Sequence, residues 1–497
     1  MPALIGTCLL FLLLLIPAIT ASPAFLIDRS QPAPPDVNVT TWVAISRGNP
    51  RGDGAGRGDR YDGKGGKGRK AGPPRGAHGP TGRKKHGLSG LTSVQAGQAW
   101  YTAIQVGGKT YQVTVDTGSS DTWLATPTFS CIADNKSSVS QSFCDFGPLY
   151  KPGPEFSPIE IVNLNLYYGK GYVKGSFGMT KVSVGGITVN QQLAIVKEAG
   201  WISDGISSGM MGLSYPSITL AFSGANYSAG EPDYSTQIPY SPLFTTMWKE
   251  HKIPPTFSIA IGRPTSNTAA GPRTNNNSPG GYLAFGGLPP VSTAGKWARA
   301  DIEAAINGSW TVPSSLPWPQ IQFYTITPDA FLYTTTPAHL APVWKPLNTT
   351  FPTSPSTSSS SSSPQKFQVL IDSGYTNTWL PTSIASHVAS LFDPPAVLNP
   401  SGSGLSNQYS VRCDAKVPQI AIKIGGVILP WDKKDLIFPD YFNETLDVEK
   451  GCISGVANGG DELIDAPYTF GDSWMRSNLV VHDVGRGEIR IKSRGNY

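Results

Sequence analysis

The sequence predicts an all-β protein of two related lobes, arranged about a pseudo-two-fold axis with a central cleft between them. Its composition of 55 Gly, 44 Pro and 15% charged residues disfavours long helices and favours turn-rich β structure. At 497 residues the chain is long enough for two lobes of roughly 150–200 residues each. The strongest observation is an internal repeat, in which residues 111–126 read YQVTVDTGSSDTWLAT and residues 367–382 read FQVLIDSGYTNTWLPT.

Each copy of the repeat is a β-branched run that stops at Asp-Thr-Gly or Asp-Ser-Gly, which is typical of a buried strand ending in a tight turn. The turns hold Asp116 and Asp372, and packing of the two copies about a pseudo-two-fold axis brings their carboxyl groups together. Two carboxyl groups so close share one proton at acidic pH, so one serves as general base on a water molecule and the other as general acid. This pair needs no metal, and we expect no cofactor.

The motifs Asp116-Thr117-Gly118-Ser119-Ser120 and Asp372-Ser373-Gly374 resemble the paired active-site motifs of the pepsin-like aspartic proteases. The resemblance spans about residues 95–497. It implies an endopeptidase that hydrolyses extended protein or peptide substrates at acidic pH, with Asp116 and Asp372 as the catalytic residues. The residues that it implies as support for the two catalytic loops are Thr117, Gly118, Ser119, Ser373 and Gly374.

Residues 100–106 alternate as a strand and turn at Gly107-Gly108 into the first catalytic strand. Further on, residues 159–189 read as a strand, a glycine-rich tip and a second strand, which predicts a long hairpin. An exposed hairpin without a functional role is the alternative interpretation.

The tip of this hairpin, Tyr168-Gly169-Lys170-Gly171, resembles the protease flap, a lid whose glycines permit movement. The resemblance implies that Tyr168 and Gly169 close over the substrate and that Tyr168 hydrogen-bonds to Trp123. Tyr167 is the alternative for this role, and a core-filling function is the alternative for Trp123.

The rest of the chain supplies elements that both lobes need. Met210 and Met211 are expected in the core behind the first catalytic loop, and Thr469-Phe470 form the equivalent segment of the second lobe. Short helices are expected from Ser241 and over residues 383–392. Residues 480–491 read as a hairpin that closes the sheet.

The expected domain organisation has four parts and one insertion. Residues 9–19 form an apolar run too short to span a membrane comfortably and precede small residues, which is typical of a cleaved signal peptide. The expected parts are a signal peptide at 1–22, a propeptide at 23–90, an N-terminal β lobe at 91–290, a C-terminal β lobe at 291–497 and a Ser-rich insertion at 352–364 within the latter.

A signal peptide implies a secreted, extracellular protein, with a vacuolar or lysosome-like compartment as the alternative. No second long apolar run occurs, so no membrane anchor is expected. We expect a monomer whose partner is its protein or peptide substrate.

The segment before the first lobe is strongly basic. Of the formal charge of +5, residues 47–87 carry +9 and residues 1–46 carry −1, which leaves −3 for residues 88–497. A Gly-, Arg- and Lys-rich arm is typical of a nucleic-acid tail, a solvated linker or a propeptide. We favour the propeptide, because basic side chains can lie against an acidic cleft until low pH protonates its carboxylates. No nucleic-acid partner is expected, and Arg83-Lys84-Lys85 offers a processing site.

Four cysteines remain after removal of Cys8 with the leader, and in a secreted protein an even number indicates disulfides. We expect the pairs Cys131–Cys144 and Cys413–Cys452, because each closes a loop within one lobe, as similar bridges do in the family. A zinc site is the alternative, although no Cys-x-x-Cys pair or nearby His supports it.

Seven Asn-x-Ser/Thr triplets are candidate glycosylation sites on the surface of a secreted protein. They begin at Asn38, Asn135, Asn226, Asn276, Asn307, Asn348 and Asn443.

The second copy departs from the motif at one position, where Tyr375 replaces the hydroxyl residue Ser119 of the first copy. A short hydroxyl can hydrogen-bond the outer oxygen of the catalytic carboxyl, and a phenol cannot fold back in that way. Loss of this bond favours the protonated form of Asp372. The departure therefore supports an alternative function, a catalytically impaired binding or inhibitor protein on a protease fold.

Overall fold

The computed structural model describes eleven stretches of the chain. They are residues 87–94, 99–169, 171–224, 232–263, 278–305, 321–337, 339–347, 367–400, 406–439, 451–460 and 468–495. The expected signal peptide, nearly all of the expected propeptide, the insertion at 352–364 and every candidate glycosylation site except Asn135 lie outside these stretches.

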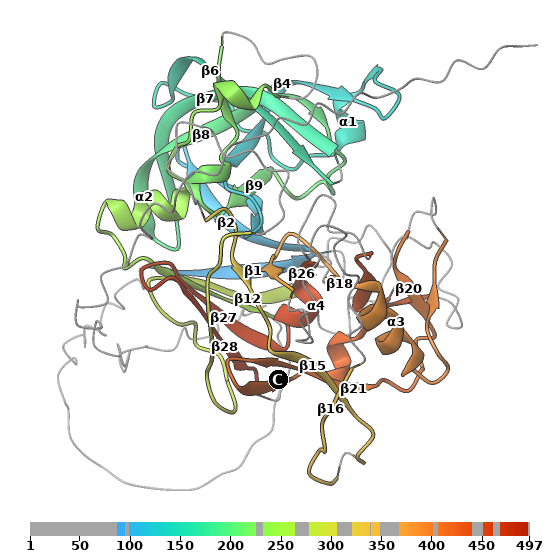
Figure 1. The fold of residues 1–497 in the computed structure, drawn as a ribbon. Coiled ribbons are helices and arrows are strands. Elements are labelled where there is room, and N and C mark those ends of the chain that lie inside the picture. The colour runs from blue at the N-terminus through green and yellow to red at the C-terminus, as the bar shows by residue number, and fades with distance from the viewer. Residues whose placement is uncertain are drawn as a thin grey trace, which may run out of the picture. The chain divides into compact units, whose positions relative to one another are not determined.

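The described part of the chain is mostly β structure, as the composition predicts (Figure 1). The largest sheet has fifteen strands in the order β10-β6-β7-β8-β4-β9-β3-β2-β1-β12-β11-β27-β28-β13, with β5 paired to β4. Its strands are β1 Leu88–Val94, β2 Ala99–Val106, β3 Lys109–Asp116, β4 Thr122–Ile132, β5 Ser138–Val139, β6 Ser157–Tyr168, β7 Gly171–Val184, β8 Ile187–Gly200, β9 Gly209–Gly212, β10 Ala221–Ser223, β11 Thr256–Ile261, β12 Ser278–Phe285, β13 Ala298–Asp301, β27 Asn478–Asp483 and β28 Glu488–Ser493.

Three smaller sheets belong to the second half of the chain. The first contains β14 Thr325–Ile326, β17 Val369–Ile371, β26 Tyr468–Phe470, β18 Thr378–Leu380 and β25 Val456–Asn458. The second contains β16 Lys345–Pro346, β15 Ala330–Thr334, β21 Gln419–Ile424 and β22 Val427–Pro430. The third contains β19 Val397–Leu398, β20 Tyr409–Val411, β24 Cys452–Ser454 and β23 Ile437–Pro439.

The repeat predicted from the sequence is also a repeat of structure. In the first copy β3 leads to Asp116 and pairs in parallel with β9, the Gly-Met-Met-Gly strand. In the second copy β17 leads to Asp372 and pairs in parallel with β26, which contains Thr469 and Phe470. Both crossing strands are buried, as predicted for the two segments behind the catalytic loops.

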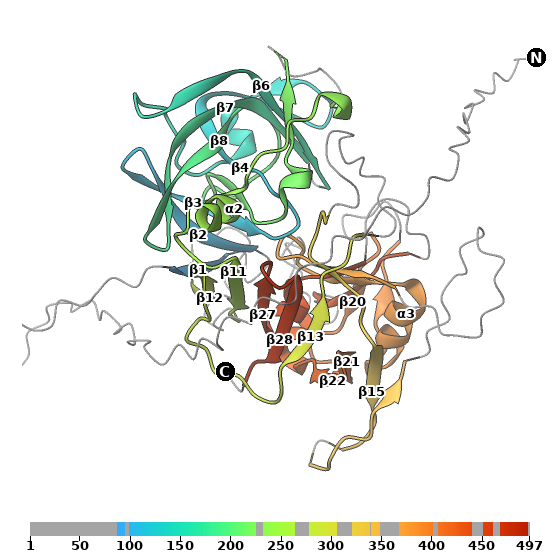
Figure 2. The same ribbon diagram turned by 60° about the vertical axis from the view of Figure 1, so that its left-hand side comes forward.

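Strands from both halves of the chain meet in the large sheet. The C-terminal hairpin of β27 and β28 confirms the predicted closing hairpin, and β27 pairs with β11 from the first half. Figures 1 and 2 show this red hairpin in the same sheet as β12 and β1, and Figure 2 shows β11 between β12 and β27. Strands from both sides of the expected lobe boundary, at residues 290 and 291, therefore belong to one continuous sheet.

The first described strand begins before the expected start of the N-terminal lobe. Strand β1 pairs with β12 on one side and β2 on the other, so it is an internal strand of the large sheet. The expected start of the first lobe at residue 91 lies inside β1. A boundary before Gly87 fits the structure better, because the Gly87 amide already donates to the Gly185 carbonyl at 2.7 Å.

The predicted long hairpin is present as β6 and β7, paired from Ser157 to the tip at Tyr168 and Gly171. Its second strand ends at Val184 and not at residue 189, because Gly185 and Gly186 adopt positive φ and turn the chain into β8. The region is thus a three-stranded meander of β6, β7 and β8 within the large sheet.

Helices are few and short, as expected. The described α-helices are α1 Gln141–Cys144, α2 Leu243–Lys249, α3 Thr382–Ser390 and α4 Asp472–Met475. The predicted helices near residues 241 and 383–392 correspond to α2 and α3, and each follows a proline at its N-cap position. None of the described helices is long and apolar enough to cross a membrane.

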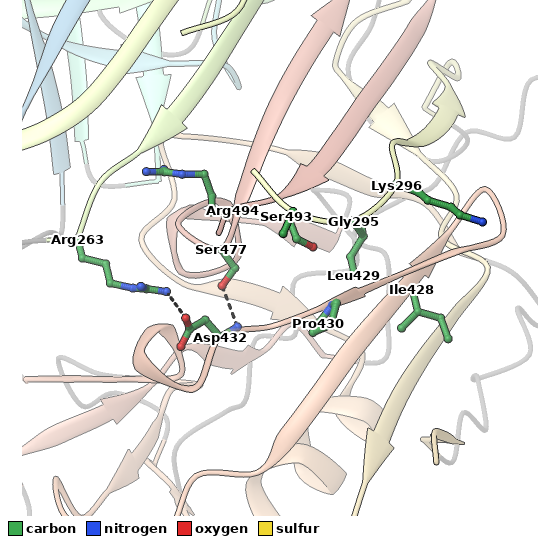
Figure 3. A pocket seen from close by; sticks show the side chains of 11 residues that line it. Arg263, Gly295, Lys296, Ile428, Leu429, Pro430, Asp432, Ser477, Ser493 and Arg494 are labelled. Carbon is green, nitrogen blue, oxygen red and sulfur yellow. Dashed lines mark hydrogen bonds and ion pairs between the residues drawn. The ribbon is translucent and has the colours of Figure 1, made fainter. Parts of the chain in front are cut away.

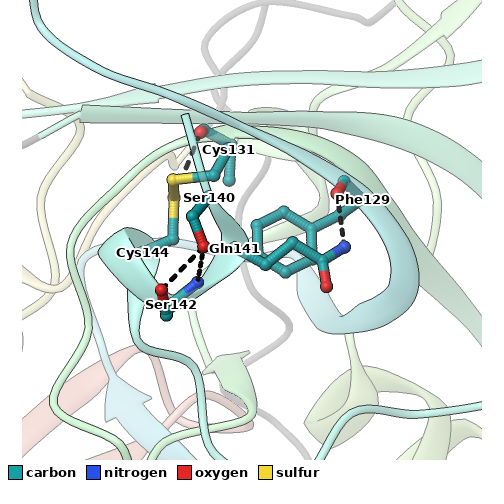
Figure 4. The surroundings of a disulfide bond; sticks show 7 residues. Phe129, Cys131, Ser140, Gln141, Ser142 and Cys144 are labelled. Atoms are coloured by element: carbon teal, nitrogen blue, oxygen red, sulfur yellow. Dashed lines mark hydrogen bonds between the residues drawn. A yellow bond between two sulfur atoms is a disulfide. The ribbon is translucent and has the colours of Figure 1, made fainter. Parts of the chain in front are cut away.

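The two predicted disulfides are both present. They argue against the zinc alternative, because they use every cysteine except Cys8. Cys131 is bonded to Cys144 and Cys413 to Cys452. Figure 4 shows the first bridge joining α1 to the end of β4, where Gln141 also donates to the Phe129 carbonyl at 2.6 Å. Each disulfide therefore links two segments of the same half of the chain.

A buried histidine lies in the large sheet at β27. His482 is fully buried, its ring stacks on Phe257 at 4.3 Å, and the ring of Tyr324 meets it edge-on at 4.5 Å. Neither ring nitrogen has a hydrogen-bond partner among the described residues. Burial alone lowers the pKa of His482 from 6.5 to about 3.

We predict that His482 makes the fold sensitive to acid. Because the folded pKa lies below the unfolded one, the contribution of neutral His482 to stability is complete above about pH 6.5 and is lost as pH falls toward 3. The loss over that range is roughly 4 kcal/mol by the usual conversion of pKa shifts. The variant His482→Phe should show a much flatter decline of Tm between pH 6.5 and pH 3. His339→Gln, at an exposed histidine, should retain the decline, and an unchanged slope in His482→Phe would contradict the assignment.

Candidate active site

The loops that follow β3 and β17 are fastened to each other by reciprocal hydrogen bonds. Thr117 Oγ1 donates to the Ile371 carbonyl at 3.0 Å and accepts the Ser373 amide at 3.0 Å. Ser373 Oγ donates to the Val115 carbonyl at 2.9 Å and accepts the Thr117 amide at 3.2 Å. Two residues that the sequence placed in supporting roles therefore join the two copies of the repeat.

This link brings the two aspartates together. Asp116 and Asp372 are 5% and 3% exposed, and a hydrogen bond joins their carboxyl groups. A Cβ atom at Gly374 would lie only 2.6 Å from Asp116 Oδ1, and one at Gly118 would collide with the Asp372 carboxyl. Each carboxyl thus lies over the glycine of the other loop, which explains why both motifs require glycine at this position.

The two carboxyl groups differ in the hydrogen bonds that they accept. Asp116 accepts the Gly118 amide at 2.8 Å and the Ser119 hydroxyl at 2.5 Å. Asp372 accepts the Gly374 amide at 2.7 Å. Burial, and next the charge of Asp116, raise the pKa of Asp372 well above its usual range, against the opposing effect of the glycine amides. The surroundings of Asp372 therefore favour its protonated form.

The tip of the flap hairpin reaches this pair of carboxyl groups. Trp123 Nε1 donates to the Tyr168 hydroxyl at 2.8 Å, the hydrogen bond expected from the sequence. Burial and the charge of Asp116 raise the pKa of Tyr168 well above 10, so its phenol is neutral. Gly169 is exposed, and a Cβ placed on it would meet no atom within 4 Å. Open space therefore adjoins the flap tip.

Tyr167, the alternative for the flap role, points elsewhere. Its ring is 39% exposed and stacks on Tyr172 with 5.3 Å between centroids, with the Lys174 ammonium near both rings. Because neighbouring residues of a strand face opposite sides, only Tyr168 lies against Trp123.

Two functional candidates escaped the sequence analysis. Trp201 packs edge-on against Tyr168 at 5.2 Å and against Trp123 at 6.3 Å, so it completes an aromatic wall beneath the flap. Asp472, at the start of α4, is buried next to the dyad, and burial raises its pKa well above 3.8. Its position immediately after Gly471 was visible in the sequence, but an aspartate at a helix start is ordinarily an exposed cap.

Asp121, five residues after Asp116, is another buried carboxyl. It accepts the Leu220 amide at 2.9 Å and the Tyr240 hydroxyl at 2.7 Å. Burial raises its pKa from 3.8 to about 6, and these two hydrogen bonds only partly oppose the rise. The second copy of the repeat has the neutral residue Asn377 at the same position, where its amide donates to the Ser454 carbonyl.

A cavity of about 440 Å³ lies elsewhere, among residues of the second half and the end of β11 (Figure 3). The acidic residue that lines this cavity, Asp432, is already paired with Arg263 at 2.8 Å. Arg263 also contacts Asp435 at 2.7 Å. Neither aspartate of the dyad lines this cavity. Among the described residues no group of three or more His, Cys, Asp or Glu side chains is placed to hold a metal ion.

A β fold with two aspartates joined at the ends of duplicated strands, beneath a tyrosine-tipped hairpin, defines the class of aspartic proteases. Comparison with known proteins agrees. The model of the eukaryotic aspartyl protease family matches residues 99–316 and 335–493. The chain therefore belongs to the eukaryotic aspartyl protease family, and the predicted pepsin-like fold and aspartic-type endopeptidase activity are confirmed.

Individual relatives are similar over most of their length. A probable aspartic-type endopeptidase of Aspergillus fumigatus is 31% identical over 82% of this chain and 81% of its own. Rhizopuspepsin-4 of Rhizopus niveus is 24% identical over 80% of this chain and 78% of its own. The crystal structure of an aspartic proteinase from Irpex lacteus has a TM-score of 0.55 at 15% identity, covering 82% of this chain and 97% of its own, which supports the fold.

We predict that Asp121 destabilises the protein as pH rises through 6. Its folded pKa lies above the unfolded value of 3.8, so its contribution is complete below about pH 4 and is lost above about pH 6. The loss is roughly 3 kcal/mol. Asp121→Asn, which copies the second half of the repeat, should therefore lose less Tm than the parent protein between pH 4 and pH 7. Asp134→Asn, at an exposed aspartate, is the matched control, and parallel Tm curves for the parent and Asp121→Asn would contradict the prediction.

Proposed function

We propose that this protein is a secreted endopeptidase that cleaves extended protein or peptide substrates at acidic pH, with Asp116 and Asp372 as its catalytic residues. The observation that carries the proposal is the buried pair of interacting carboxyl groups, held by the Thr117 and Ser373 link. Such a pair provides an ionised base and a protonated acid in one place.

The different hydrogen bonds of the two carboxyl groups support a different role for each. The Asp116 carboxylate removes a proton from a water molecule as the water oxygen bonds to the peptide carbonyl carbon. Asp372 gives its proton to the carbonyl oxygen, which forms a neutral tetrahedral diol. Proton transfer to the peptide nitrogen then accompanies breakage of the C–N bond, and a hydroxyl proton returns to the dyad.

The surrounding residues serve this reaction in three ways. Gly118 and Gly374 allow the carboxyl groups to approach, and their amides orient them. Ser119 stabilises the charge on Asp116. Tyr168 and Gly169 form a lid over the substrate. The hydrogen bond from Trp123 fixes the position of this lid, and the closed lid excludes bulk water during the reaction.

Secretion and activation by propeptide removal are part of the proposal. The apolar leader at residues 9–19 and two disulfides fit a protein made in an oxidising compartment, with a vacuolar or lysosome-like location as the alternative. The basic arm serves as the propeptide. Cleavage at Arg83-Lys84-Lys85 would leave β1 intact in a monomeric enzyme, which fits the pairing of β1 in the large sheet.

Glycans would occupy some of the seven Asn-x-Ser/Thr triplets. Asn135, the one that the structure describes, is exposed in a turn between β4 and β5. Its side-chain oxygen accepts both the amide and the hydroxyl of Ser137, the third residue of the triplet.

The catalytic proposal predicts loss of activity when either aspartate is neutralised. Asp116→Asn and Asp372→Asn should each reduce kcat by about 10²–10⁴-fold or more, because each removes one member of the acid–base pair. The assay incubates processed protein with acid-denatured haemoglobin between pH 2.5 and pH 6, with and without a statin-type inhibitor. Asp301→Asn, on the exposed part of β13, should retain activity. Absence of inhibitor-sensitive cleavage in the parent protein would support the rival function, a binding or inhibitor protein.

Tyr375 predicts a second, more specific result. The side chain of Ser119 donates to Asp116, and a serine at position 375 would donate to Asp372 in the same way, which favours ionised Asp372. The upper pH limit of kcat/KM reports loss of the proton on Asp372, so Tyr375→Ser should move this limit to lower pH. Tyr375→Phe, which cannot donate, should leave it unchanged. A limit that is equal in all three proteins would contradict the assignment of the proton to Asp372.

A further inference from the structure

We propose that Tyr375 is a specificity-determining residue, whose ring limits one substrate side-chain subsite beside the two aspartates to small, uncharged side chains. This inference rests on the proposed endopeptidase function and adds to it a substrate class. In the first copy of the repeat the equivalent residue is Ser119, whose side chain turns back onto Asp116.

The backbone of Tyr375 is fixed from two sides. Its amide donates to the Asp372 carbonyl at 3.4 Å, and its own carbonyl accepts the Asp472 amide at 2.8 Å. A Cβ at Gly471 would lie 2.5 Å from that carbonyl, so the crossing strand packs closely against it. The Cα–Cβ bond of Tyr375 therefore starts from a defined position next to the catalytic carboxyl.

The side chain of Tyr375, three residues after Asp372, is partly open to solvent. It is 39% exposed, although it follows a buried catalytic loop. Burial, and next the charges of Asp372 and Asp116, raise the pKa of its phenol to about 12. No described residue hydrogen-bonds to its hydroxyl. The exposed ring is thus a wall of the site that a substrate occupies.

Two features make this wall restrictive. Trp379 meets the ring edge-on, with 6.5 Å between centroids and an angle of 78°, and limits movement of the ring toward β18. The space that a serine would leave free is filled by a phenyl group. Side-chain size then decides which residue fits, and the neutral phenol offers no charge to bind an ionic side chain.

The experiment compares the processed parent protein with Tyr375→Ser and Tyr375→Phe. The substrates are peptide pairs that differ only by Ala or Leu at one position, scanned over the four residues on each side of the scissile bond. Each protein is measured at its own pH optimum, so that a shift in the pH profile does not alter the comparison. The readout is the ratio of kcat/KM for Ala to that for Leu at each position.

We expect the parent protein to prefer Ala by about tenfold or more at one position, since steric discrimination in such pockets ranges from about 10-fold to 200-fold. Tyr375→Ser should lose this preference at that position alone, and Tyr375→Phe should retain it. Tyr333→Ser, which removes a half-buried ring from β15, should behave as the parent does.

Three outcomes would overturn the inference. They are equal ratios in the parent and Tyr375→Ser, a preference for Leu that the serine variant loses, and loss of the preference in Tyr375→Phe. Absence of cleavage by every protein, with all variants folded by circular dichroism, would instead refute the proposed endopeptidase function.

Discussion

The reciprocal hydrogen bonds between Thr117 and Ser373 set the geometry on which the rest of the site depends. Each hydroxyl donates to a carbonyl of the other strand end and accepts an amide of the other loop. A typical hydrogen bond adds only about 0.5–1.5 kcal/mol, but loss of one partner here would leave several buried polar groups unpaired. Each half therefore helps to position the aspartate of the other, because one hydroxyl from each loop bonds to backbone groups of the other half.

The two halves are similar in backbone and different in chemistry. The same parallel pairing places Asp116 and Asp372, and the same glycines let the carboxyl groups approach. Ser119 then gives Asp116 a hydroxyl donor, whereas Tyr375 gives Asp372 none. The two aspartates therefore differ in the hydrogen bonds that they accept, although the backbone pairing around them is the same.

Local patterns in the sequence were sufficient to predict the strands of the repeat, the flap and the dyad. The first copy contains its own β-branched run and turn, and the Tyr168 tip is marked by its glycines. Strand β1 was missed because its sequence, LSGLTSV, has no strong alternation and pairs with β12, almost two hundred residues away. Its partner was not visible from local composition.

The burial of the titratable groups could not be predicted from the sequence for the same reason. Asp121 differs from an exposed aspartate only through Leu220 and Tyr240, which lie 99 and 119 positions further along the chain. Trp201 stands alone in a polar stretch, and its role appears only when the flap folds over it. The sequence shows that such residues are present, but their contacts and burial depend on how distant strands pack together.

Buried groups outside the dyad give the fold a pH dependence that is separate from that of the chemistry. His482 disfavours the folded state as pH falls, and Asp121 disfavours it as pH rises. Neither group takes part in the proposed reaction: His482 lies in β27, and Asp121 lies in the loop immediately before β4. The lower and upper pH limits of activity can therefore arise from unfolding as well as from titration of the dyad. The titration of Asp116 and Asp372 can be measured from reaction rates only over a pH range in which the folded fraction is constant. Within that range a change in rate has a single source.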